Sequence, residues 1–296
     1  MRFETDNLST EQIPSRSRIR RVGGNARQMA VIAPLPVDCG TCAARGNGLC
    51  AELTDCELAK VRHARSGDKL VPAGSDVFAL GTHCQTIYNL VDGWAFRYSI
   101  MEDGQRQILD FVLPGAVLGF CTAKNSVSTY GVQALTNATL CAIPRETFTA
   151  LLRNMPELGI RLAWLIARDR NLAYDRLSSI GKLSAREQVA HLILELFTRC
   201  HAQWPGHDIN EMYLPLTQEH VGDAVGMTGV HVNRVLRELR EEGILEFHYR
   251  RLRVLNIDRL VDVAKIDPHL AVQWSAKPRK ISTLSHLNLA AQDMVL

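Results

Sequence analysis

Short apolar segments separated by turn residues fill the chain between residues 69 and 144. Turn signals such as Asp92-Gly93, Glu102-Asp103-Gly104 and Pro114-Gly115 fall between these segments, and Asp-Gly pairs favour tight hairpins. Short strands at such regular spacing predict a compact antiparallel β-barrel or sandwich. The predicted strands include residues 77–80, 86–91, 94–98, 107–112 and 138–143.

After Pro156 the apolar positions recur at steps of three, four and seven residues, which predicts a helix of about 24 residues, or roughly 36 Å. Gly181 ends the pattern. A stripe that keeps a heptad-like step often packs against another helix, so we expect a homodimer seam. The alternative is that the helix packs only on its own barrel. The predicted dimer-interface residues are Leu158, Leu162, Leu165, Ile166, Asp169, Leu172 and Leu177.

Another helix is predicted from Ser184, because Ser184 followed by Glu187 forms a capping-box pattern. Further along, Thr217 and Thr228 can each cap a short helix, with Gly226-Met227 as the turn between the two helices. Two strand-like segments then flank the basic stretch His248-Tyr249-Arg250-Arg251. This order predicts a winged helix-turn-helix, whose second helix fits the major groove of double-stranded DNA.

The second helix of this motif carries side chains that suit base recognition. Arginine can bind guanine O6 and N7 together, asparagine can bind adenine N6 and N7, and other arginines suit phosphates. The alternative is that the arginines form a solvated surface, but the turn, caps and wing together favour DNA binding. The predicted DNA-binding residues are Thr228, Val230, His231, Asn233, Arg234, Arg237, Arg240, Arg250 and Arg251.

Composition narrows the functional class. The chain has 296 residues and a net charge of only +3, so it is long enough for about two domains and any basic surface must be local. We expect a cytoplasmic protein, because no apolar stretch is long enough to span a bilayer and the first residues lack the apolar core of a secretory signal. HExxH, GxSxG and P-loop motifs are missing from the sequence, which argues against an enzyme.

The predicted organisation has six parts. A disordered tail is expected first, because residues 13–27 carry five arginines, no acid and few apolar side chains. The parts are the tail (1–38), a cysteine segment (39–60), the β-barrel domain (61–150), the dimerisation helix (151–182), the winged helix-turn-helix (183–258) and a C-terminal extension (259–296).

Eight cysteines are present, and Cys39, Cys42, Cys50 and Cys56 fall within eighteen residues. Clustered thiols in a chain without an export signal are more typical of metal ligands than of disulfides. Four thiolates can hold an iron–sulfur cluster or a tetrahedral zinc ion, and they can also be free thiols. The residues alone leave these three alternatives open.

The order of β-barrel, long helix and winged helix-turn-helix resembles the CRP/FNR family of bacterial transcription regulators. The most specific matches are Gly104 to Ile108, Leu113-Pro114-Gly115, Cys141 to Pro144, and Leu216 to Gly222 with Asn233-Arg234. The resemblance implies an α+β chain with a cyclic-nucleotide-binding-like sensor domain. It further implies a homodimer that binds a palindromic operator and acts on RNA polymerase.

Two departures limit what the resemblance implies. Oxygen-responsive FNR proteins read DNA with Glu, Ser and Arg, whereas this chain has Val230 and Asn233 at the first two positions and keeps Arg234. The FNR half-site is therefore not expected. Residues 116–120 lack the ribose-binding Gly-Glu pair of the CRP branch, and residues 126–133 contain no Arg. A cyclic phosphate without a cationic partner is poorly held, so we expect no cAMP binding.

The spacing Cys39-Gly-Thr-Cys42, followed after seven residues by Cys50, resembles the cysteine cluster of FNR-type oxygen sensors. Their fourth ligand precedes an Ile-Pro pair, which corresponds to Cys141. The resemblance implies a [4Fe-4S] cluster on Cys39, Cys42, Cys50 and Cys141, with Cys56 and Cys121 as substitutes if one ligand is misassigned. Zinc, an empty site, or a different signal such as haem, nitric oxide or thiol oxidation are the alternatives.

A switching hypothesis follows from this resemblance. Assembly of the cluster would pin the flexible cysteine segment to the barrel and alter the seam of the long helix. Asp169 on or near the seam would meet its symmetry mate, and like charges at close range oppose dimerisation. Oxygen would destroy the cluster and release the operator.

Overall fold

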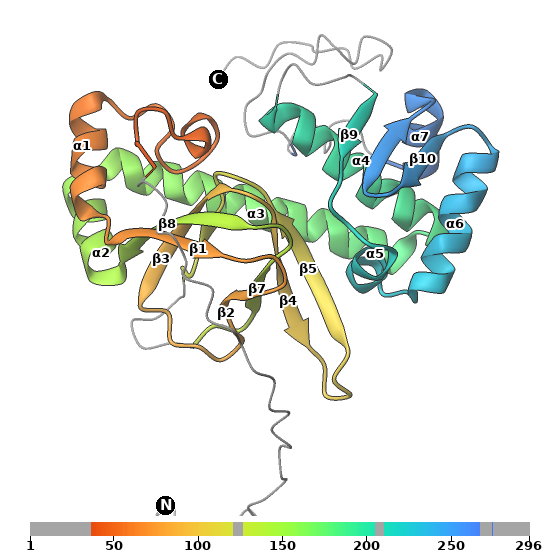
Figure 1. Cartoon of the computed structure of the whole chain (residues 1–296), viewed down its shortest axis with the longest axis horizontal. Helices are drawn as coiled ribbons and strands as arrows, with labels where there is room; N and C mark the ends of the chain where they lie inside the picture. The colour runs from red at the N-terminus through yellow and green to blue at the C-terminus, as the bar shows by residue number, and fades with distance from the viewer. Residues whose placement is uncertain (1–36, 121–126, 205–209, 267–273, 275–296) are drawn as a thin grey trace, which may run out of the picture. The chain divides into compact units, whose positions relative to one another are not determined.

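The structure is a computed structural model that describes residues 37–120, 127–204, 210–266 and Trp274 (Figure 1). The chain divides into residues 1–35 and residues 36–296, and every feature reported below belongs to the second unit. The predicted tail, most of the predicted C-terminal extension, the Pro205-Gly206 helix stop and Cys121 lie outside the described residues.

Two four-stranded antiparallel sheets form the first half of the described chain (Figure 1). The first sheet has the order β1-β8-β3-β6 and the second has the order β2-β7-β4-β5. In the first sheet the strands are β1 (Gly67–Val71), β8 (Ala138–Pro144), β3 (Thr86–Asp92) and β6 (Val117–Leu118). In the second sheet they are β2 (Asp76–Phe78), β7 (Gly131–Ala134), β4 (Ala95–Ile100) and β5 (Arg106–Val112).

The sheets pack as a sandwich rather than closing into a barrel. Leu90, Leu118 and Leu140 of the first sheet share one buried core with Val112 and Val132 of the second sheet. No strand ladder joins the two sheets within the described residues. The prediction of a barrel or sandwich therefore resolves to a sandwich held together by side-chain packing.

The two Asp-Gly signals have different roles. Gly104, at φ +83°, turns the hairpin between β4 and β5 as predicted. Gly93, at φ +88°, instead carries the chain from β3 in one sheet to β4 in the other, so the hairpin expected there is wrong. A Cβ at Gly93 would collide with the carbonyl oxygen of Asn137. Glycine is required at this crossing because two backbones meet there.

Helices flank the sandwich. The long helix α3 (Pro156–Lys182) begins at Pro156 and runs for 27 residues, close to the prediction. Neither α1 (Asp55–Ala64) nor α2 (Arg145–Asn154) was predicted, although Thr54 and Glu57 form a capping box at the start of α1. A second buried core joins α1, α2 and α3 to the first sheet through Leu49, Val61, Ile87, Ile143, Phe148, Leu158, Leu162 and Leu165.

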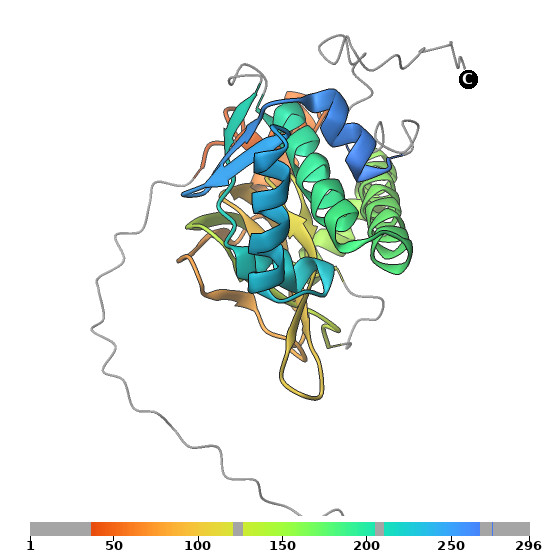
Figure 2. The same cartoon turned by 90° about the vertical axis from the view of Figure 1, so that its right-hand side faces the viewer.

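The C-terminal part is built on α4 (Ala185–Gln203), which the Ser184–Glu187 capping box begins as predicted. The helices α5 (Gln218–Val225), α6 (Gly229–Glu241) and α7 (Ile257–Ala264) all contact α4 (Figure 2). A three-stranded sheet of order β10-β11-β9 completes this part, with one strand more than predicted. Its strands are β9 (Glu211–Tyr213), β10 (Leu245–His248) and β11 (Arg251–Val254).

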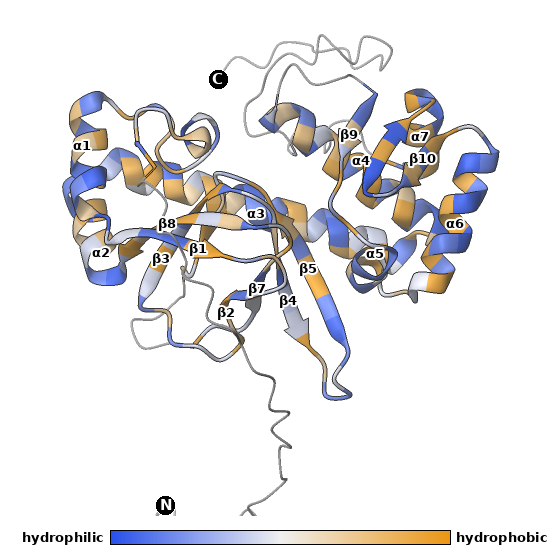
Figure 3. Cartoon of the chain, viewed as in Figure 1, coloured by the Kyte–Doolittle hydropathy of each residue, from blue (hydrophilic) through white to orange (hydrophobic). Residues whose placement is uncertain are grey.

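Hydropathy follows this packing (Figure 3). Val232, Val235, Leu236 and Leu239 of α6 are buried in the core shared with α4, and apart from Gly229 and Val230 the other positions of the helix are polar. Such an amphipathic pattern anchors one face of α6 and leaves the other face available to a partner. None of the described helices is both long enough and apolar enough to cross a lipid bilayer.

Candidate nucleic-acid interface and cysteine site

The helix-turn-helix is set by side-chain caps and one left-handed glycine. The Oγ1 of Thr217 accepts from the backbone N–H of His220 at 3.2 Å, and Thr228 accepts from the N–H of His231 at 3.3 Å. Gly226 ends α5 at φ +71°. A Cβ at Gly222 would meet the carbonyl oxygen of Met227, so a small residue is required where the turn crosses α5. These local signals explain why the motif was readable from the sequence.

The structure places the predicted DNA-binding side chains of α6 outward. Asn233, Arg234 and Arg237 are exposed, and Val230 near the start of the helix is 83% exposed. His231 is half-buried and so less exposed than these residues. The hydroxyl of Thr228 accepts the hydrogen bond that caps α6. The exposed face opens onto a hollow lined by Thr217, Gln218, Glu219, Gly229, Val230 and Asn233.

The wing carries the remaining predicted contacts. Arg250 and Arg251 are exposed beside β10 and β11, but Arg251 forms an ion pair with Glu211 at 2.6 Å. The guanidinium of Arg240 lies 3.0 Å from Nε2 of His248 on the wing. Arg234 lies 4.0 Å from Glu238, so it is more loosely held. Arg250 and Arg234 are therefore better placed than Arg251 to meet a phosphate or a base.

Tyr249 is a surface residue that the predicted set did not include. It occupies the tip of the wing, is 99% exposed, and has φ +50°, while Arg250 beside it has φ +62°. Two adjacent non-glycine residues in the left-handed region make an energetically costly turn. The aromatic residue between two basic positions was visible in the sequence, but its exposure was not.

The four predicted cysteine ligands come together in the structure. Cys39, Cys42 and Cys50 belong to the segment around the short helix η1 (Ala43–Gly46), and Cys141 lies on β8. All four are half-buried free thiols. Burial, and then the neighbouring thiols of Cys141, Cys42 and Cys39, raise the pKa of Cys50 to about 12. Burial likewise raises the pKa of Cys141 to about 12, against the opposing effect of Arg65.

Arg65 and Asp68 lie beside this cysteine site, and neither was predicted. Arg65 donates to Sγ of Cys39 at 3.1 Å and to the carbonyl oxygen of Val37 at 2.9 Å. Asp68 accepts from the N–H of Val37 at 2.7 Å and pairs with Arg65. Asp68 is also the register partner of Cys141 on the neighbouring strand. The pair therefore ties the cysteine segment to β1, which pairs with the strand that carries the fourth thiol.

The chemistry of the four thiols bears on which cofactor fits. Within the described residues, no three His, Cys, Asp or Glu side chains converge closely enough to hold a metal ion. The four cysteines are nevertheless close enough to affect one another electrostatically. Four thiolates are the donor set of a four-iron cluster and also of a tetrahedral zinc ion, so these residues fit either group.

The exposed face of α3 differs from the predicted seam. Leu158, Leu162, Leu165 and Leu172 are buried within their own chain, as the alternative interpretation expected for this helix. Of the predicted apolar set, Ile166 and Leu177 are exposed. The leucines of the apolar stripe predicted from the sequence therefore form the inward face of α3. A second set of apolar residues points outward. This outward face consists of Ile160, Ala163, Trp164, Ile166, Ala173, Tyr174, Leu177 and Ile180.

Asp169 also has a different role from the predicted one. Its carboxylate accepts from Arg97 of β4 at 3.0 Å and from Arg168 at 3.2 Å. Burial alone would raise the pKa of Asp169, but Arg97 and Arg168 hold it below its ordinary value. The charge of Asp169 is therefore paired within its own chain, which would weaken the predicted repulsion from its symmetry mate; that repulsion stays a prediction.

Comparison with known proteins agrees with this architecture. The model of the cyclic nucleotide-binding domain matches residues 68–155, and that of the Crp-like helix-turn-helix domain matches residues 187–263. The chain belongs to the CRP/FNR family of transcription regulators. It is thus a DNA-binding transcription regulator, and the family members it matches are regulators rather than enzymes.

Three CRP/FNR relatives are similar along most of their length. The transcriptional activator FnrL of Cereibacter sphaeroides is 29% identical, over 77% of this chain and 92% of its own. The nitrogen fixation regulation protein FixK of Bradyrhizobium diazoefficiens is 27% identical, over 80% of this chain and 98% of its own. The fumarate and nitrate reduction regulatory protein of Escherichia coli is 26% identical, over 85% and 97%.

Solved structures agree on the fold. FixK2 from Bradyrhizobium japonicum matches with a TM-score of 0.61 and 24% identity, covering 68% of this chain and 98% of that one. A CRP/FNR family regulator from Thermus thermophilus matches with a TM-score of 0.55 and 21% identity, covering 67% and 98%.

Proposed function

We propose that this CRP/FNR regulator is a homodimer whose operator affinity is controlled by an oxygen-labile [4Fe-4S] cluster. The observation that carries the proposal is the meeting of four cysteine thiols from two distant parts of the chain at one half-buried place. The named relatives FnrL and the fumarate and nitrate reduction regulator support the same assignment.

Cys39, Cys42, Cys50 and Cys141 would hold the cluster. When bound, the cluster supplies a group that oxygen can oxidise and dismantle. The residues of this chain do the remaining work. Three thiols fix the η1 segment, Cys141 fixes β8, and Arg65 brings a positive charge to a site whose thiolates are negative. Release of the thiols would leave the η1 segment free to move relative to β8.

Operator recognition would centre on the start of α6. Arg234 suits a guanine and Asn233 an adenine, while the exposed Val230 suits the methyl group of thymine. Arg250 at the wing suits a phosphate. A two-fold dimer presents two such helices, so the operator would be palindromic, with the bound dimer placed to act on RNA polymerase.

The outward face of α3 would form the dimer interface. It runs from Ile160 to Ile180 and exposes large side chains, with Leu177 at 69% and Ile160 at 72% exposure. Long helices that expose an apolar stripe at this spacing pair readily with a second copy. A symmetric interface would place the same residues of both chains against one another.

The experiment that tests the proposal compares protein purified without oxygen before and after exposure to air. We expect about four iron and four sulfide per chain, a brown absorption band that air bleaches, and operator binding that is lost with the band. Cys141→Ala should lack both the band and anaerobic operator binding. Cys56→Ala is the matched control, because Cys56 is an exposed cysteine outside the four.

Other metal contents would overturn the proposal in distinct ways. Zinc in place of iron, with no response to air, would indicate a structural metal site. Iron without sulfide, in a haem spectrum, would indicate a gas sensor. A metal-free protein that air still switches would indicate direct thiol oxidation.

A further inference from the structure

The segment between Cys42 and Cys50 is attached to α3 by one arginine. Nε of Arg161 donates to the carbonyl oxygen of Gly48 at 3.1 Å, and its Nη2 is 3.3 Å from the carbonyl oxygen of Asn47. Both acceptors lie within the loop that carries three of the four thiols. A guanidinium presents several donors in a fixed fork, so one side chain can hold two successive carbonyls.

Gly48 is packed so closely that a side chain would not fit at this position. A Cβ there would lie 2.6 Å from the carbonyl oxygen of Ala44 and 2.8 Å from Cα of Gly115. The N–H of Gly48 also donates to Ala44 at 2.9 Å. Only glycine therefore fits at this position, and its close packing against Ala44 and Gly115 sets where the carbonyls bound by Arg161 lie in this conformation of the loop.

The other side of Arg161 faces the outward surface of α3. Its guanidinium lies 4.6 Å from the ring centroid of Trp164, a partly exposed member of the outward face. Stacking of a guanidinium on an indole is favourable and orients both groups. Movement of the Asn47 and Gly48 carbonyls would therefore shift Arg161 and change its contact with Trp164 at the proposed dimer interface.

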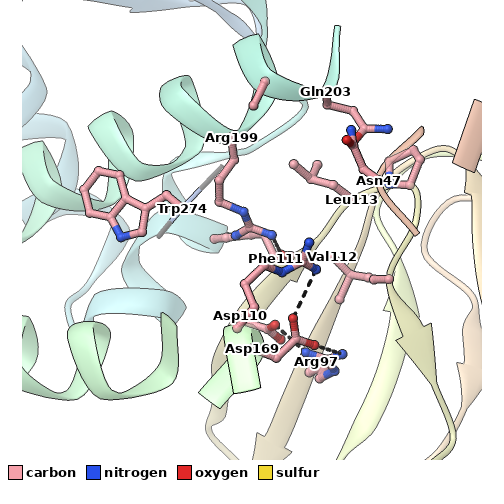
Figure 4. A pocket seen from close by; sticks show the side chains of 14 residues that line it. Asn47, Arg97, Asp110, Phe111, Val112, Leu113, Asp169, Arg199, Gln203 and Trp274 are labelled. Carbon is pink, nitrogen blue, oxygen red and sulfur yellow. Dashed lines mark hydrogen bonds and ion pairs between the residues drawn. The ribbon is translucent and has the colours of Figure 1, made fainter. Parts of the chain in front are cut away.

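The same loop touches the DNA-binding part of the chain. Nδ2 of Asn47 donates to Oε1 of Gln203 at 2.8 Å, and Gln203 is the last residue of α4. Figure 4 shows Asn47 and Gln203 together on one side of a cavity of about 30 Å³, with Asp110, Asp169 and Arg97 on another side. Asn47 thus lies where the loop, the second sheet and α4 meet.

We propose that Arg161 and Asn47 are positioning residues that couple the state of the cysteine site to the dimer interface and to α4. The inference rests on the proposed function. With the thiols held, the loop presents the Asn47 and Gly48 carbonyls to Arg161 and the Asn47 amide to Gln203. The contacts are formed here with the four thiols free, so the cluster is not needed to make them. By joining the loop to β8, it would hold the loop carbonyls in this position, and without it the loop could move and the contacts to Arg161 and Gln203 would weaken. Each contact then contributes a free-energy difference between two states of the chain, which coupling requires.

The test measures the dimer dissociation constant by sedimentation equilibrium, with and without the cluster, alongside iron and sulfide content. The wild type should dimerise about 5- to 150-fold more tightly with the cluster, the range usual for coupled sites. Arg161→Gln should keep its iron and sulfide, but its ratio should fall to within about twofold of one. Asn47→Ala should also keep its iron and sulfide, but its ratio should fall only in part, because the backbone carbonyl of residue 47 still accepts from Arg161. Arg161→Lys keeps the charge without the two-pronged geometry and should retain an intermediate ratio.

Arg153→Gln is the matched control, since Arg153 is an exposed arginine of α2 and its replacement should leave the ratio unchanged. A wild-type ratio that Arg161→Gln and Asn47→Ala retain at full iron content would overturn the coupling alone. Loss of iron from both variants would also overturn the coupling, because the two residues would then be needed to retain the cluster and not to link it to the dimer interface. If the dimer dissociation constant of the wild type were the same with and without the cluster, the proposed switch itself would be overturned.

Discussion

Arg65 shows how much a single buried charge can contribute to a site of thiols. Burial opposes its positive charge, but Cys141, Cys39 and Asp68 together raise the pKa of Arg65 well above its ordinary value. Its hydrogen bonds also fix the backbone at Val37, two residues before Cys39. One guanidinium therefore supplies both charge balance and position, and a neutral residue of similar length would supply neither in full.

We expect Arg65→Gln to weaken retention of the cluster. The thiolates would lose their nearby cation and the segment before Cys39 would lose its anchor. The measurement is iron and sulfide per chain after gel filtration without oxygen, where we expect a loss of about half or more. Arg62→Gln is the control, because Arg62 in the last turn of α1, just before Arg65, is exposed and pairs only loosely with Asp38 at 3.4 Å. Equal iron content in the two variants would contradict this role for Arg65.

At the scale of elements, α3 has two apolar faces in different surroundings. The inward face packs on the first sheet, α1 and α2, and the outward face lies open with Arg170 near the middle of its length. In a two-fold pairing of this face, Arg170 would lie close to Arg170 of the second copy. The sequence pattern predicted like-charge repulsion between the two copies at Asp169. Because Arg170 is the exposed charge on this face, we expect that repulsion at Arg170.

Replacement of Arg170 by Leu should tighten the dimer, because it removes a like-charge pair and adds apolar area. We expect the dimer dissociation constant to fall by about tenfold, which corresponds to about 1.4 kcal/mol. Sedimentation equilibrium in air, where the wild type is expected to be mostly monomeric, is the sensitive measurement. A dimer that becomes weaker would show that Arg170 makes a favourable contact across the interface.

The junction of α3, α4 and α7 carries a titratable contact. Nε2 of His191 lies 2.9 Å from the carboxylate of Asp175, and its Nδ1 lies 3.1 Å from the carbonyl oxygen of Ala264. Burial would lower the pKa of His191, but the hydrogen bond and charge of Asp175 raise it above its ordinary value. A raised folded-state pKa means that the charged pair stabilises the protein fully below the unfolded value and that this stabilisation is lost as the pH rises through the folded value.

His191→Gln should therefore cost most stability at mildly acidic pH, and the difference from wild type should shrink as the pH rises. Urea unfolding between about pH 5.5 and about pH 8.5 brackets the relevant range. His63→Gln serves as the control, since His63 is an exposed residue of α1. A difference that grows with pH would contradict the sign of the shift.

At the scale of the whole molecule, DNA binding depends on two copies of a modest basic surface. The net charge of the chain is only +3, and Glu211 already offsets Arg251 on the wing. A dimer doubles the exposed arginines of α6 and the wing. Steep salt dependence is then a property of the assembled dimer more than of one chain.

Arg250→Ala should reduce the salt dependence of operator binding without changing which operators are preferred. Loss of one phosphate contact in each half-site should lower the slope of log K against log salt by about two for the dimer. Arg234→Ala should instead cost about 1–3 kcal/mol for each half-site and relax specificity at one base pair. Fluorescence anisotropy with matched and mismatched operators over a salt series separates the two effects. Identical behaviour of both variants would contradict the assigned roles.

Local patterns in the sequence were enough for the elements whose signals are local. The caps at Thr217 and Thr228, the turn at Gly226-Met227 and the apolar face of α6 predicted the helix-turn-helix, because caps and turns act within a few residues. The cysteine spacing and the family motifs likewise pointed to four ligands, and the structure brings those four thiols together. Strand positions were also readable, since a period of two needs no knowledge of the partner strand.

Contacts between distant residues were decided only by the tertiary structure. A helix with two apolar stripes does not reveal which one faces inward. Of the predicted apolar seam residues on α3, Ile166 and Leu177 face outward, and the other four are buried within the chain: Leu158, Leu162, Leu165 and Leu172. Asp169 accepts a hydrogen bond from Arg97, which lies 72 residues away in the sequence. Arg65 donates a hydrogen bond to Cys39. The side chain of Arg161 meets a loop 113 residues earlier in the chain. Such pairings depend on how sheets and helices stack, and no local periodicity encodes that stacking.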